Sequence, residues 1–181
     1  MIKKGADPMK VLLILAIFFL SSCDNASVDK EYAEKIAFGS RDDIIEALRH
    51  EIASKNGPDE IYALISSGPY VNEGNRVVRV KAGKAEISYY HPWSDVWHNP
   101  WVKDLSDMEY AELKKSLLNA DKLEPLGFRA YDAVEYVYVH LWKDGSVIVR
   151  MNNPDDDTPE HIALVEAFQS LASKKQLKGD E

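Results

Sequence analysis

The chain contains 181 residues, of which 22 are Lys or Arg and 30 are Asp or Glu, so its formal net charge is −8. A chain with this acidic surplus is not expected to bind nucleic acid or anionic lipid head groups electrostatically, and a basic protein partner suits it better. Its single cysteine excludes an intramolecular disulfide and a thiolate metal site. We expect one globular domain, residues 31–181, which is long enough to bury a substantial core.

The first 22 residues have the layout of a secretory signal. Three lysines precede an unbroken run of ten apolar residues, 11–20, and this charged-then-apolar order is typical of exported proteins. Ten helical residues extend only about 15 Å, roughly half the hydrocarbon core of a bilayer, so the run is too short for a transmembrane helix. Either Met1 or Met9 can serve as the first residue without altering the exported protein.

The apolar run ends in Leu20-Ser21-Ser22-Cys23, which resembles the lipobox of bacterial lipoproteins. The resemblance implies that residues 1–22 are removed and that Cys23 carries at least two acyl chains, enough for firm anchoring. Residues 23–30 then form the lipidated N-terminus and a polar tether. Asp24 resembles the inner-membrane retention signal of enteric-type bacteria, so we expect a lipid-anchored protein at the periplasmic face of the inner membrane.

Five helices are predicted, mainly from apolar spacing and capping residues. Tyr32 and Ile36 begin a first helical stripe, which Gly39 interrupts, and Ser40 with Asp43 caps a second. A helix from 107 to about 121 begins with a capping box, Ser106-Asp107-Met108-Glu109. Asn56-Gly57-Pro58 ends the second helix and begins a short helix through Ile65, which we favour over a strand at residues 61–65. Thr158 and Pro159 begin the last helix, with four residues predicted inward: Ile162, Val165, Phe168 and Leu171.

Two hairpins are predicted from residue alternation and turn signals. A loop at Gly83-Lys84 would pair Val80 with Ile87 and Lys81 with Glu86. A turn at Asp144-Gly145 would pair Trp142 with Val147, His140 with Val149 and Tyr138 with Met151. The second hairpin is apolar on both faces, so its strands should be central. The expected fold is α+β, an antiparallel sheet of about four strands from two hairpins, with helices packed on it.

The segment HPWSDVWHNPW, residues 91–101, is the main candidate site. One interpretation is a packed loop at the edge of the sheet. A second is recognition of a protein or a sugar through its large aromatic surfaces and nearby polar groups, namely Trp93, Asp95, Trp97, His98 and Trp101. A third is zinc binding by His91, Asp95 and His98, although Pro92 and Pro100 disfavour the helix that would align them.

Two further clusters have a structural and a chemical interpretation. Asp155, Asp156 and Asp157 offer oxygen ligands for calcium, but without an EF-hand pattern they are better explained by Asp157 and Thr158 capping the last helix. His140 is expected to be buried and hydrogen-bonded. The alternative is a general base reached by Glu135 or Asp132.

No catalytic signature or phosphate loop is apparent in the sequence, and no cofactor is expected. The leading hypothesis is a non-enzymatic, membrane-anchored binding module, such as an inhibitor or immunity protein for a basic protein partner. One alternative is an envelope-glycan-binding module that uses Trp93, Trp97 and Trp101. The other is a metal-assisted hydrolase that uses His91, Asp95 and His98.

Overall fold

The computed structural model describes residues 30–67, 74–91, 100–121, 135–152 and 158–171. The chain divides into two compact units, residues 1–30 and 31–181, and the fold below is that of the second. The expected signal peptide, Cys23, Asp24 and nearly all of the tether lie outside the described residues. Within the described part, no helix is both long enough and apolar enough to cross a membrane.

The centre of the domain is an antiparallel sheet in the order β4-β3-β2-β1-β5-β6. The antiparallel sheet of the predicted α+β fold is confirmed, but the described residues form six strands rather than about four. Their bounds are β1 Glu60–Ser67, β2 Asn75–Lys81, β3 Lys84–Tyr90, β4 Trp101–Asp104, β5 Glu135–Trp142 and β6 Val147–Asn152. The short helix favoured for residues 61–65 is wrong, because this run is part of the central strand β1. A strand covered on both faces is apolar almost throughout, so alternation does not reveal it.

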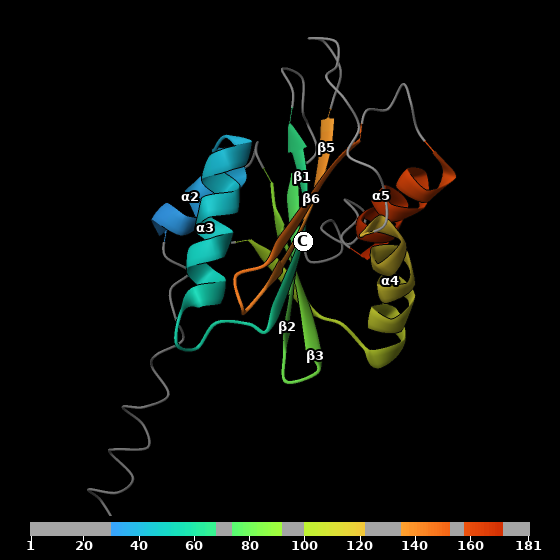
Figure 1. Cartoon of the computed structure of the whole chain (residues 1–181), viewed down its shortest axis with the longest axis horizontal. Coiled ribbons are helices and arrows are strands. Elements are labelled where there is room, and N and C mark those ends of the chain that lie inside the picture. Colours follow the sequence, from blue (N-terminus) through green and yellow to red (C-terminus); the bar gives the residue numbers. More distant parts are fainter. Residues whose placement is uncertain (1–29, 68–73, 92–99, 122–134, 153–157, 172–181) are drawn as a thin grey trace, which may run out of the picture. The chain divides into compact units, whose positions relative to one another are not determined.

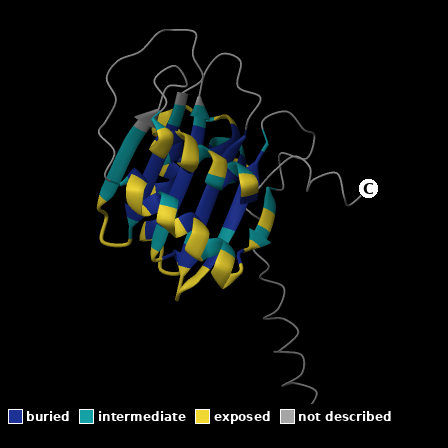
Figure 2. Cartoon of the chain, turned by 90° about the vertical axis from the view of Figure 1, so that its right-hand side faces the viewer, coloured by how far each residue is buried: buried dark blue, intermediate teal, exposed yellow. Residues whose placement is uncertain are grey.

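Helices cover both faces of the sheet (Figure 1). On one side lie α2, Lys30–Phe38, and α3, Arg41–Ala53, and on the other lie α4, Asp107–Ala120, and α5, Pro159–Leu171. Each side has its own apolar core, and Figure 2 shows buried strands behind the more exposed α4 and α5. Successive strand residues point to opposite faces, so each interior strand supplies both cores.

The predicted starts of α3 and α4 are confirmed. Ser40 and Asp43 form one capping box and Ser106 and Glu109 another, and each satisfies backbone N–H groups that the helix leaves unpaired. The predicted inward face of α5 is partly wrong, because Ile162 is exposed and Val165 only half-buried. The buried residues are His161, Leu164, Phe168 and Leu171. The apolar residues of α5 are distributed over most of the helix circumference, so their spacing does not select one buried face.

The first hairpin closes one residue earlier than predicted. Its turn residues, Ala82 and Gly83, have φ angles of 50° and 77°, and two positive φ values are typical of a type I′ turn. The predicted pairs, Val80 with Ile87 and Lys81 with Glu86, are therefore wrong. The observed pairs are Val78 with Ile87, Arg79 with Glu86, Val80 with Ala85 and Lys81 with Lys84. Pairing shifts by two residues, so every side chain keeps its predicted face.

The second hairpin has a three-residue loop, 143–145, in place of the predicted two-residue turn. The N–H of Gly145 donates to the carbonyl of Trp142 (2.9 Å), and Gly145 has a φ of 89°, as in a type I turn followed by a bulge. The predicted pairs Trp142–Val147, His140–Val149 and Tyr138–Met151 are wrong by one residue. The observed pairs include Tyr138–Arg150, Val139–Val149 and His140–Ile148. This slip reverses the faces of β6 relative to the prediction; β6 is also an edge strand, whereas β5 is central as predicted.

Candidate binding site

The structure describes only part of the predicted aromatic site. Trp93, Asp95, Trp97 and His98 lie outside the described residues. Trp101 is the first residue of β4, where it is half-buried against the core beneath α4 and α5. His91 follows β3 and makes an edge-on contact with the ring of Tyr89, with centroids 5.8 Å apart. Trp101 therefore packs at the sheet edge, but in a strand rather than in the expected loop.

The other predicted clusters are also only partly described. Asp132, Asp155, Asp156, Asp157 and the side chain of Glu135 lie outside the described part of the chain. Among the described side chains, no group of three or more His, Cys, Asp or Glu residues is arranged to hold a metal ion.

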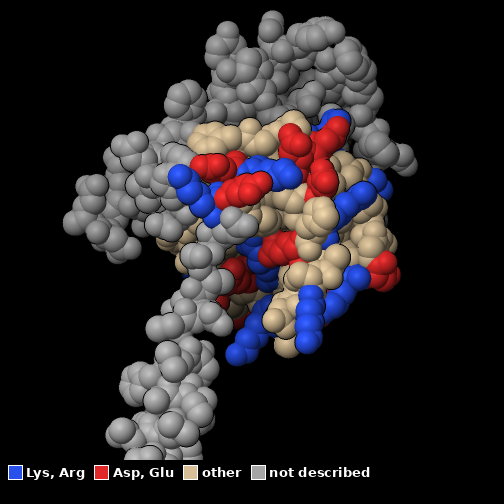
Figure 3. Space-filling view, turned by 90° about the vertical axis from the view of Figure 1, so that its left-hand side faces the viewer, with Lys and Arg blue, Asp and Glu red and all other residues tan. Residues whose placement is uncertain are grey.

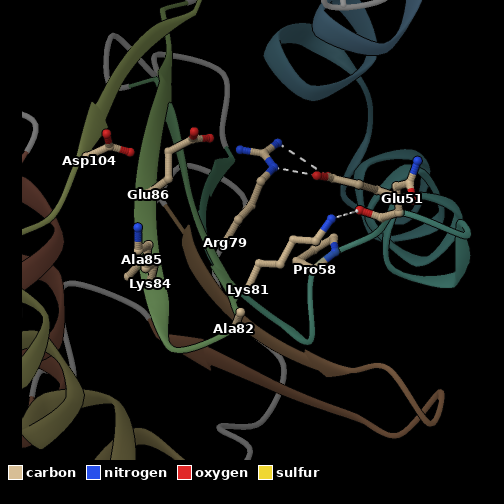
Figure 4. A pocket seen from close by; sticks show the side chains of 10 residues that line it. Glu51, Pro58, Arg79, Lys81, Ala82, Lys84, Ala85, Glu86 and Asp104 are labelled. Carbon is tan, nitrogen blue, oxygen red and sulfur yellow. Dashed lines mark hydrogen bonds and ion pairs between the residues drawn. The ribbon is translucent and has the colours of Figure 1, made fainter. Parts of the chain in front are cut away.

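A groove of about 570 Å³ lies between the C-terminal end of α3 and the strands β2, β3 and β4 (Figure 4). The helices α2 and α3 cover the middle of the sheet, whereas β4 lies at its edge. Three basic and three acidic side chains line the groove: Arg79, Lys81, Lys84, Glu51, Glu86 and Asp104. Basic and acidic side chains are also interspersed over this face of the domain (Figure 3). A binding groove needs such polar groups to fix the orientation of its ligand.

Arg79 forms the inner wall of the groove, and its side chain is only 15% exposed. Its guanidinium donates to both carboxylate oxygens of Glu51, to the hydroxyl of Ser88 (2.7 Å) and to the hydroxyls of Tyr90 (2.9 Å) and Tyr32 (3.1 Å). These bonds connect α2, α3, β2 and β3. A guanidinium with this many partners is held rigidly, because its planar N–H groups each fix one direction.

Burial controls the ionisation of this cluster. Burial raises the pKa of the Tyr32 hydroxyl well above its ordinary value, although the Arg79 charge works in the opposite direction. Burial also raises the pKa of Tyr90. Burial disfavours the charged form of Arg79 and so acts to lower its pKa, but the neighbouring Tyr90 and Glu51 raise that pKa well above the ordinary value. The cluster therefore holds neutral tyrosines around one ion pair at neutral pH.

The outer rim of the groove is formed by the β2–β3 turn. Lys81 Nζ donates to the carbonyl of Asn56 (2.6 Å), and Asp59 accepts from the backbone N–H of Ala82 (2.9 Å). On the opposite wall, Glu86 lies directly across from Asp104 in the β3–β4 pairing. Two carboxylates in this position repel each other, so a cation placed between them would be stabilised.

A second polar cluster surrounds His140 on the other face of the sheet. The imidazole side chain is only 4% exposed, and Nδ1 lies 3.0 Å from Asp121 Oδ2 while Nε2 lies 3.2 Å from Glu60 Oε2. Tyr138 donates to Asp121 (3.0 Å), and the Tyr62 hydroxyl donates to Glu60. The predicted buried, hydrogen-bonded histidine is confirmed. Its partners are Asp121 and Glu60, which connect β5 to β1 and to the end of α4.

Sequence reasoning missed the Arg79 cluster. Arg79 alternates with the apolar residues Val78 and Val80, and this pattern indicates a strand but does not show that α2 and α3 pack over Arg79. The sequence contains one signal that points to a buried ion pair. Glu51 lies seven residues after Ile44, on the apolar stripe of α3, and a carboxylate there needs a buried partner. The sequence alone does not identify that partner.

Comparison of the chain with protein-family models, with curated proteins and with solved structures found no match in any of the three. The domain is therefore described by its architecture alone. The described residues form a six-stranded antiparallel sheet between two pairs of helices, with a polar groove beside one edge strand.

Proposed function

We propose that this protein is a lipid-anchored binding module at the periplasmic face of the inner membrane, and that it recognises a basic protein partner, as an inhibitor or immunity protein would. The observation that carries this proposal is the groove between α3 and β2–β4. It combines a rigid wall built around Arg79 with a pair of opposed carboxylates, Glu86 and Asp104.

Two electrostatic features support a protein partner with a basic surface. The acidic surplus of the chain attracts positive surfaces at long range and increases the rate of encounter. Within the groove, three basic and three acidic side chains offset each other, so the groove contributes specificity through the positions of its charges rather than through its net charge. Trp93, Asp95, Trp97 and His98 belong to the connection from β3 to β4, and we propose that they take part in recognition, whereas Trp101 packs against the core on the face opposite the groove.

Affinity capture tests this proposal. The full-length chain would be used as bait in lysates of cells that express it together with the products of neighbouring reading frames. We expect one specific, basic protein to be captured by the wild type, and capture to fall at least about tenfold with Glu86→Lys, which reverses one charge of the groove.

Glu166→Lys is the matched control, because Glu166 is exposed on α5, on the opposite face of the sheet. This variant makes the same change in net charge and should retain the partner. Capture of no specific partner by the wild type would overturn the proposed function. Equal loss with both variants would show that only net charge matters and would remove the groove from the proposal.

A further inference from the structure

The strand β4 presents backbone hydrogen-bonding groups at one edge of the sheet. It is the terminal strand in the order and pairs only with β3 among the described strands. The N–H of Leu105 donates to the carbonyl of Ala85 (2.9 Å). Because antiparallel ladder bonds alternate along a strand, this bond directs the N–H and C=O groups of Val102 and Asp104 away from β3. Within the described residues no strand pairs with these groups, so they can serve as hydrogen-bond donors and acceptors for an added strand.

The side chains of the same two residues are also exposed. Val102 and Asp104 both point to the side of the sheet that carries α2 and α3, since their partners Ser88 and Glu86 lie on that side. Val102 is 46% exposed, one of the few large apolar residues of the described chain to be so exposed, and Asp104 lines the groove. The surface beside β4 is therefore an apolar position followed, two residues on, by an acidic one.

The opposite edge strand, β6, is a poorer docking site. Val147 and Val149 pack against the core beneath α2 and α3, and Ile148 and Arg150 are only half-exposed on the other face. Side chains of a strand added to β6 would meet no groove there. An added strand at β4, in contrast, would place the side chain opposite Asp104 beside the groove.

We infer that the partner binds by adding an extended strand to β4, with an apolar side chain against Val102 and a Lys or Arg side chain, two residues away, between Asp104 and Glu86. This inference rests on the proposed function and specifies its geometry. Backbone hydrogen bonds to Val102 and Asp104 would supply affinity, and the alternating apolar and basic side chains would supply specificity. The cation would relieve the repulsion between the two opposed carboxylates.

A synthetic peptide tests the inference without the physiological partner. The probe is an acetylated and amidated octapeptide, Thr-Val-Thr-Lys repeated twice, titrated into the ¹⁵N-labelled full-length chain. We expect backbone amide shift changes to concentrate at residues 101–104 and at Glu86. The matched peptide with Glu in place of Lys should bind at least about tenfold more weakly, because its carboxylates meet Asp104.

Two variants make the test specific. Asp104→Lys should reverse the preference, so that the Glu peptide binds more tightly than the Lys peptide. Val102→Pro removes an N–H that is not used by the β3–β4 ladder and should weaken both peptides while leaving thermal unfolding near the wild-type value. If Val102→Pro does not fold, the Asp104→Lys variant still tests whether the peptide binds beside β4.

Three results would overturn the inference: no binding at millimolar peptide, shift changes centred on β6, or no reversal of preference with Asp104→Lys. Failure of the inference remains distinct from failure of the proposed function. A partner captured by the wild type but retained by both β4 variants would leave the binding function in place and show that the partner docks by another route.

Discussion

Glu109 shows how one side chain can serve two elements. Its carboxylate accepts from the backbone N–H of Ser106 (2.9 Å) as part of the capping box of α4, and it also pairs with Lys103 of β4. The hydrogen bond from Lys103, together with those from Ser106, lowers the pKa of Glu109 to about 2. Ionised Glu109 thereby stabilises the start of α4 and its attachment to β4.

The low pKa of Glu109 predicts an acid-dependent loss of stability. A carboxyl whose pKa is lower in the folded state contributes stability above its unfolded value near 4.5, and this contribution is lost as the pH falls through about 2. Glu109→Gln should therefore lose less stability than the wild type between these pH values. Urea unfolding midpoints at pH 6 and pH 3 measure the difference.

Glu112→Gln controls for the removal of one carboxylate from the same helix, since Glu112 is exposed and pairs only with Lys115 among the described contacts. Parallel acid profiles for the wild type and Glu109→Gln would contradict the prediction.

At the scale of elements, the Arg79 cluster fastens one pair of helices to the sheet. Glu51 belongs to α3 and Tyr32 to α2, and both contact the guanidinium that projects from β2. The cluster also fixes the inner wall of the groove, so the attachment of α3 and the shape of the candidate site depend on the same hydrogen bonds.

Removal of one member of the Arg79–Glu51 ion pair should lower the free energy of unfolding more than removal of both members. Arg79→Met leaves the largely buried Glu51 carboxylate without its cation, and we expect a loss of about 3 kcal/mol in the free energy of unfolding. The double variant Arg79→Met, Glu51→Met should be more stable than Arg79→Met alone, because no charge is then left uncompensated.

Urea unfolding of the three proteins measures these differences. Arg49→Met, on the exposed side of α3, is the control and should change the free energy of unfolding by less than about 0.5 kcal/mol. A double variant less stable than Arg79→Met would show that the pair stabilises the fold by more than its compensation of charge.

At the scale of the whole molecule, the proposal combines a membrane anchor with a binding domain. The polar tether expected after Cys23 would extend only roughly 20 Å at about 3.3 Å per residue. The domain would then operate close to the membrane, and a partner would have to be recognised there.

This proposal predicts that membrane attachment depends on one residue. Cys23→Ser removes the only thiol of the chain, so the variant should lose its acyl chains and leave the membrane fraction. Fractionation of cells that express the wild type or the variant, followed by detection of the protein in each fraction, measures the effect. Retention of Cys23→Ser in membranes to the same extent as the wild type would exclude lipid anchoring through this residue.

Local signals and long-range packing differ in how far they could be predicted. The capping boxes at Ser40 and Ser106 were recognised because both partners lie within four residues of each other. The hairpin registers were missed because each depends on the φ angles of its loop, and Asp144-Gly145 occurs in both two-residue and three-residue loops. Strand β4 was missed because it has only four residues, beside Pro100.

The sequence by itself determined the α+β class, the starts of three helices, the presence of both hairpins and the burial of His140, because each follows from spacing, capping or residue type over a short range. Only the tertiary structure decided that residues 61–65 lie in the central strand, that His140 meets Asp121 and Glu60, and that Arg79 meets Glu51. These contacts join positions between 19 and 80 residues apart, and their geometry is set when the helices pack on the sheet. The groove likewise forms only when the helices pack on the sheet.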